Sequence, residues 1–198
     1  MSILDMLSQQ LGGEAMRQIG KQLGTDEGTA SKAVAGALPM IVSALAKNAS
    51  KPEGADSLRR ALEKDHDGSV LDNLGGLIGG SQNKMGEGIL RHVLGGQRGQ
   101  VESGLGKATG LSSGSTGQLL AMLAPMVMGA LGKQQRSRGL DSTGLAEMLG
   151  GERRRVEKAD PGVAGMLTSF LDSDGDGKIS DEVAKMGVGL LGKMFSGR

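Results

Sequence analysis

A chain of 198 residues with 23 Lys and Arg against 22 Asp and Glu has a formal charge of +1, which offers little attraction to polyanions. A dedicated nucleic-acid binder is therefore not expected. The absence of cysteine excludes disulfides, thiolate metal sites and cysteine nucleophiles. Aromatic residues make up 1% of the chain, and a core of Leu, Ala, Met and Gly suits helix packing better than a pleated sheet. The composition predicts an all-α protein.

No targeting segment is expected at the start of the chain. Residues 1–10 lack a basic region, and Asp5 interrupts their apolar residues, so a cytoplasmic protein is predicted. The two most apolar stretches, 33–46 and 119–131, are shorter than the roughly 18–20 residues of a membrane span. Each contains a central proline. We therefore expect buried core helices that kink there, or helix pairs that break there, and no transmembrane segment.

The sequences around the two prolines are similar. Residues 38–47 read LPMIVSALAK, and residues 124–133, 86 positions later, read APMVMGALGK. Weaker similarities upstream and downstream keep nearly the same offset. The simplest interpretation is two related units, residues 1–80 and residues 81–198.

Within each unit the apolar residues recur at intervals of three and four, which predicts helices. The segment TDE at residues 25–27 is expected to cap the first of the two most apolar helices, and Ser112 or Ser113 the second. The 36 glycines indicate close helix contacts and helix C-caps. Polar, Gly-containing stretches at 48–54, 95–99 and 134–139 are the predicted connectors.

The clearest motif lies near the C-terminus, where residues 172–182 read DSDGDGKISDE. This matches the opening of an EF-hand loop, in which carboxylates at positions 1, 3 and 5 converge on Ca²⁺ and a glycine at position 6 makes the sharp turn. The side chains of Asp172, Asp174 and Asp176 are the predicted ligands, followed by Gly177. The other predicted ligands are the carbonyl of Lys178, Ser180 acting through a water, and Asp181 or Glu182.

The motif departs from a standard EF-hand at position 12, where Val183 replaces the bidentate glutamate. Either the loop closes one residue early on Glu182, or Asp181 supplies a single oxygen. In both cases binding weaker than in sensor sites is expected, toward about 10⁻⁵ to 10⁻³ M. The alternative is a solvated Asp/Gly turn that holds no ion.

Residues 63–74 of the first unit repeat part of this register. Asp65, Asp67 and Gly68 align with the carboxylates and glycine of the second loop. Glu63 at position 1 is longer than the tight turn favours, and Lys64 adds a repelling charge. The loop at residues 63–74 is therefore predicted to be a degenerate calcium loop.

Together, the duplicated LPM and APM helices, the Gly-rich ends and the acidic Asp-x-Asp-Gly-Asp-Gly loop resemble the uncharacterised bacterial family of YidB-like proteins. The resemblance implies an all-helical fold similar to helix-turn-helix arrangements and no established activity. Two units are more than the shorter members of that family contain.

No constellation of catalytic residues is evident. Residues 110–114 read GLSSG, but a nucleophile elbow needs a preceding strand and a histidine partner, and His66 and His92 are not placed near it by any pattern. We therefore expect a non-enzymatic calcium-binding helical protein that acts by self-association or by binding a protein partner. The alternative is a membrane-surface or envelope-associated protein whose C-terminal residues 188–195 insert amphipathically.

Overall fold

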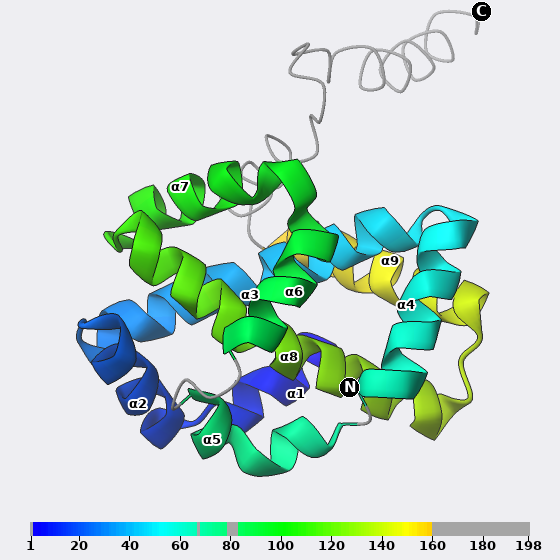
Figure 1. The fold of residues 1–198 in the computed structure, drawn as a ribbon, viewed down its shortest axis with the longest axis horizontal. Coiled ribbons are helices and arrows are strands. Elements are labelled where there is room, and N and C mark those ends of the chain that lie inside the picture. The colour runs from blue at the N-terminus through cyan, green and yellow to red at the C-terminus, as the bar shows by residue number, and fades with distance from the viewer. Residues whose placement is uncertain (1, 67, 79–82, 160–198) are drawn as a thin grey trace, which may run out of the picture.

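The computed structural model describes residues 2–66, 68–78 and 83–159, and every regular element within these ranges is helical (Figure 1). This confirms the all-α prediction. The α-helices are α1 (Ile3–Gln10), α2 (Gly13–Leu23), α3 (Glu27–Ala49), α4 (Pro52–Asp65), α5 (Leu74–Ile78), α6 (Asn83–Leu94), α7 (Arg98–Thr109), α8 (Ser113–Arg138) and α9 (Ser142–Ala159). Two 3₁₀ turns, η1 (Ser69–Asn73) and η2 (Gly95–Gln97), connect them.

Helices α3 and α8 cross near the middle of the molecule and form the centre of its core (Figure 1). Helix α8 is buried without interruption from residue 119 to residue 132, and α3 from residue 40 to residue 46. A helix that is apolar on all sides is stable in water only when other elements cover it completely. Around α8 this cover comes from α1, α3, α4, α6 and α7, so both halves of the chain contribute to one continuous core.

Helices α3 and α8 are also long and apolar enough to cross a membrane. In this fold, 67% of the most apolar window of α3 and 83% of that of α8 are buried against other helices. Their hydrophobicity is thus accounted for by their place in the core.

Neither central proline breaks its helix, so the expectation of helix pairs separated at Pro39 and Pro125 is wrong. Pro125 has no N–H, and the carbonyl of Ala121 four residues earlier loses its helical partner. Helix α6 approaches α8 at this carbonyl: a Cβ added to Gly86 would lie 1.8 Å from the Ala121 oxygen. Glycine permits this contact between two backbones, and burial of α8 on all sides holds it together across the proline.

The predicted caps are confirmed. The Asp26 side chain accepts a hydrogen bond from the backbone N–H of Thr29 at 2.9 Å, and Ser112 accepts one from Ser115 at 3.1 Å. Ser112 therefore begins a helix, and the GLSSG sequence follows helix α7 and no strand. Left-handed glycines end α2, α7 and α8.

The connectors are shorter than predicted. Helix α8 continues to Arg138, through most of the segment expected to be a connector. It ends where Gly139 adopts the left-handed conformation of a helix C-cap. Only Ser50 and Lys51 separate α3 from α4, and residues 95–99 form η2 and the start of α7. Polar composition in these segments reflects exposure at the ends of helices.

Equivalent glycines occur in the two halves. A Cβ on Gly20 would lie 2.9 Å from the Thr25 carbonyl, and a Cβ on Gly106 would lie 2.8 Å from the Leu111 carbonyl. The two glycines are 86 positions apart, and each sits where the chain folds back from one helix into the next.

Candidate functional sites

The predicted calcium loop lies outside the described residues. This applies to every one of its predicted ligands: Asp172, Asp174, Asp176, Lys178, Ser180, Asp181 and Glu182. Calcium binding at this loop stays a prediction from the sequence.

The first acidic segment is only partly a loop. Glu63 and Asp65 belong to the last turn of α4, so the position expected to begin a loop is helical. The Glu63 carboxylate accepts hydrogen bonds from Arg59 at 2.6 Å and from the Gln135 side-chain amide at 3.4 Å. Asp67 lies outside the described residues. Within the described ranges, no group of three or more His, Asp or Glu side chains is placed to hold a metal ion.

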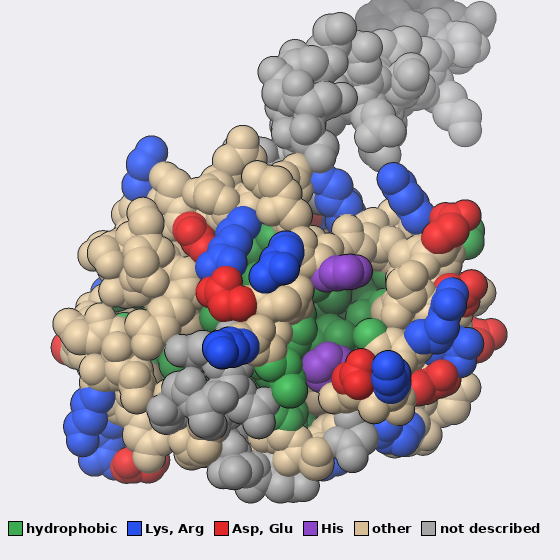
Figure 2. Space-filling model, in the orientation of Figure 1, with side chains coloured by type: hydrophobic (Ala, Val, Ile, Leu, Met, Phe, Trp, Pro, Cys, Tyr) green, Lys and Arg blue, Asp and Glu red, His purple; other side chains and the backbone are tan. Residues whose placement is uncertain are grey.

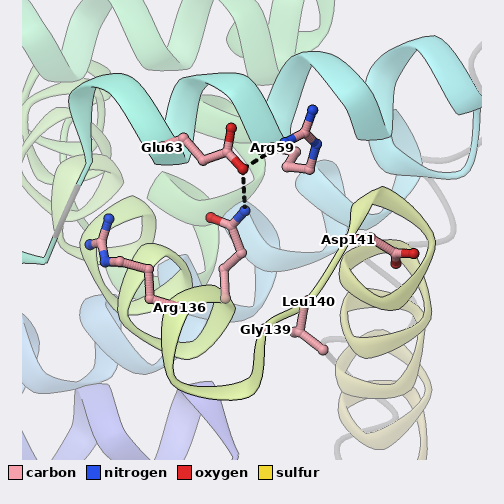
Figure 3. A pocket seen from close by; sticks show the side chains of 7 residues that line it. Arg59, Glu63, Arg136, Gly139, Leu140 and Asp141 are labelled. Atoms are coloured by element: carbon pink, nitrogen blue, oxygen red, sulfur yellow. Dashed lines mark hydrogen bonds and ion pairs between the residues drawn. The ribbon is translucent and has the colours of Figure 1, made fainter.

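Glu63 instead forms part of a pocket between α4 and the turn that joins α8 to α9 (Figure 3). The pocket has a volume of about 390 Å³. It is lined by Arg59, Glu63, Gln135, Arg136, Gly139, Leu140 and Asp141.

Most polar groups of this pocket are already engaged. Arg59 pairs with Glu63, and Asp141 accepts a hydrogen bond from the N–H of Gly144 at 2.7 Å, which caps α9. Gln135 is 4% exposed, and its Oε1 accepts no hydrogen bond in the described structure. Among the described carboxylates, none pairs with Arg136. The pocket offers one guanidinium for an anionic group and no nucleophile beside a base.

A second polar cluster links α6 to α7 through hydrogen bonds and ion pairs. The Arg98 guanidinium donates to Glu87 through both terminal nitrogens, and its Nε donates to Glu102 at 2.6 Å. These hydrogen bonds lower the pKa of the Glu87 carboxyl below its usual value and raise the pKa of Arg98. With two carboxylates on one arginine, the cluster is a structural clamp between helices.

An apolar groove lies on the face between α4 and α6. Both helices pack on α3 and α8, and Figure 2 shows hydrophobic side chains at the bottom of a hollow between them, with histidine side chains at its margins. On α6, Met85, Ile89 and Val93 follow one another at intervals of four residues, which places them along one side of the helix. Met85 is 43% exposed and is the one large hydrophobic side chain that the described structure exposes to that degree.

The two histidines differ in environment. His66, directly after α4, is buried, and desolvation lowers the pKa of its imidazole although the neighbouring Asp65 opposes this. His92 on α6 is exposed. Figure 2 shows them as two separate side chains at the margin of the hollow.

The sequence analysis missed this groove. Its signal was present in the i, i+4, i+8 spacing of Met85, Ile89 and Val93, because Gly86 and Leu90 already supply the buried side of the same helix. When an amphipathic helix has more apolar residues than its contact with the core buries, the extra apolar residues indicate a second apolar surface on that helix.

The fold defines an all-helical protein built around two long buried helices. A family model described as a bacterial protein of unknown function, DUF937, matches residues 5–134. The chain belongs to this bacterial family. No curated protein and no solved structure matches it.

Proposed function

We propose that this protein is a non-enzymatic, cytoplasmic calcium-binding protein that acts by self-association or by binding a protein partner, and not by binding nucleic acid. The observation that carries the proposal is the spacing of Asp172, Asp174, Asp176 and Gly177, which meets the requirements for the first half of an EF-hand loop. The apolar groove between α4 and α6 supports the second part, since exposed apolar surface of this kind is typical of interaction sites.

Light scattering with and without calcium tests the functional part of this proposal. Calcium is expected to change the mass of the protein, alone or with a candidate partner, and the double variant Asp174→Ala, Asp176→Ala should abolish that change. Asp65→Ala, an exposed carboxylate of the first acidic segment, is the matched control and should leave it intact. A mass independent of calcium, alone and with candidate partners, would contradict the proposed calcium-dependent association.

The alternative is a membrane-surface protein. The two most apolar helices, α3 and α8, are mostly buried in the core. The apolar stretch at residues 188–195 is therefore the segment that favours membrane association. Flotation with anionic and neutral vesicles decides between the two. Protein that stays at the bottom of the gradient with both kinds of vesicle would contradict membrane association.

We also infer that the chain consists of two related units and is a YidB-like member of its family. Several equivalent features 86 positions apart support the two units. They are the close-packed Gly20 and Gly106, the left-handed Gly24 and Gly110, the caps Asp26 and Ser112, and Pro39 and Pro125 inside their helices. In this arrangement α1 to α4 correspond to α6 to α9. The YidB-like assignment rests on the sequence pattern, and the helix-turn-helix likeness stays part of this proposal.

A further inference from the structure

The groove beside α6 has one well-defined wall. Gly86 lies against Ala121 of α8, and Glu87 reaches Arg98 at the start of α7. Ile89, two residues after Glu87, therefore lies on nearly the opposite side of α6 from α7, and Figure 1 shows α4 on that side. Val93, seven residues after Gly86, lies nearer the face that packs on α8. The end of α6 is held in place by Asn48, whose side-chain amide donates to the Val93 carbonyl at 3.0 Å.

The opposite wall belongs to α4. Glu63 points into the pocket beside the α8–α9 turn (Figure 3). Ala61, two residues earlier, lies on nearly the opposite side of the helix and is half-buried.

In the other half of the molecule, the place that corresponds to the groove lies between α9 and α1, and it is closed. Under the proposed two-unit arrangement, α4 matches the first part of α9, but α9 continues for two more turns to Ala159. There the Ser2 hydroxyl donates to Glu152 at 2.5 Å, which joins the start of α1 to α9. The counterpart of Glu152 is His66, where α4 has ended, and residues 69–73 form η1 and pack on α8 instead. Two turns of covering helix thus lack a helical counterpart among the described residues.

The same chain contains a segment of suitable pattern. Val183, Met186, Leu190 and Met194 recur at intervals of three and four, which would align them on one face of a helix. The described chain ends at Ala159 on α9, which itself packs on α3 and α4 beside the groove. Residues 160–182 reach up to about 80 Å when extended, so the distance to the groove is no obstacle.

We propose that residues 183–195 of the same chain dock as an amphipathic helix into the groove between α4 and α6, with their apolar face on Ala61, Ile89 and Val93. The docking depends on apolar contacts and needs no calcium, so it stands apart from the proposed calcium site. A partner helix that uses this groove must first displace the segment.

Paramagnetic broadening in the full-length protein tests this docking, and the absence of cysteine allows one specific label. A nitroxide is attached to Ser196→Cys, just after the segment, and NMR spectra are compared before and after reduction of the label, in chelator. The expected result is loss of the signals of Ile89, Val93 and Ala61, while Thr29 and Lys32 at the far end of α3 keep theirs.

A variant and a mixing experiment make the test decisive. Ile89→Lys should restore the broadened signals, whereas Lys107→Ala on exposed α7 should not. If Ile89→Lys alters the spectrum throughout, Met85→Lys at the exposed end of the same stripe replaces it. Equal signal loss along all helices, or none, would overturn the proposal. If broadening arises only when labelled and unlabelled molecules are mixed, the groove holds the segment of a second copy, and docking within one chain is overturned. If vesicles that bind residues 183–195 remove the broadening, the segment is docked in the absence of lipid.

Discussion

The Ser142 hydroxyl at the start of α9 donates a hydrogen bond to the Asp56 carboxylate on α4. The two residues are 86 positions apart, the same offset that separates Pro39 from Pro125. The hydrogen bond therefore joins α4 to α9 at two positions that the proposed two-unit arrangement makes equivalent.

This hydrogen bond should stabilise the fold measurably. A double-mutant cycle of Asp56→Ala and Ser142→Ala is expected to give a coupling free energy of about 1 kcal/mol, because the acceptor is charged but only partly buried. Urea unfolding followed by circular dichroism measures it. Ser57→Ala, at the exposed neighbouring position, should couple to Ser142→Ala by close to zero. Equal coupling of Ser57 and Asp56 would show that the hydrogen bond contributes nothing specific.

Gly86 should tolerate no side chain. Its added Cβ would meet the Ala121 carbonyl, so Gly86→Ala must push α6 away from α8, at a cost of about 3 kcal/mol or more in unfolding free energy. Gly88 lies on the same helix with open space around it. There the alanine should stabilise by roughly 0.5 to 1 kcal/mol, because it lowers the entropy of the unfolded chain. A neutral Gly86→Ala would show that the two helices do not approach as described.

His66 should make the fold sensitive to mild acid. Burial lowers the pKa of its imidazole in the folded state, so the unfolded chain binds the proton more readily. Its full contribution is present above the unfolded pKa of about 6.5, and stability falls as the pH drops below that value. Unfolding free energies measured across this range should depend less on pH in His66→Gln than in the unsubstituted protein. An equal or steeper slope in His66→Gln would contradict the expectation.

The helical fold was readable from the sequence because composition and period agree over long segments. Strict three- and four-residue spacing, caps at Asp26 and Ser112, and terminal glycines all indicate helices. What failed was local: a proline such as Pro125 ordinarily ends a helix, but here the released carbonyl of Ala121 lies against the backbone of α6. Such tertiary compensation has no signal in a local pattern.

The sites were less predictable than the fold. Helix α4 ends at Asp65, whereas α9 runs on to Ala159, and under the proposed two-unit arrangement this difference in length leaves the groove open. Sequence similarity alone does not show where a helix ends. Glu63 lies in the last turn of α4 and contacts Gln135 of α8, and local spacing does not show a contact between such distant residues. The calcium loop at residues 172–182 has the stronger sequence signal, since it depends on local spacing alone.

Calorimetric titration of Ca²⁺ into chelator-treated full-length protein tests the central claim most directly. One site with a dissociation constant between about 10⁻⁵ and 10⁻³ M is expected, and its heat should vanish in the Asp174→Ala, Asp176→Ala variant but persist in Asp65→Ala. No heat, or the same heat in all three proteins, would contradict calcium binding and reduce residues 172–182 to an Asp/Gly turn.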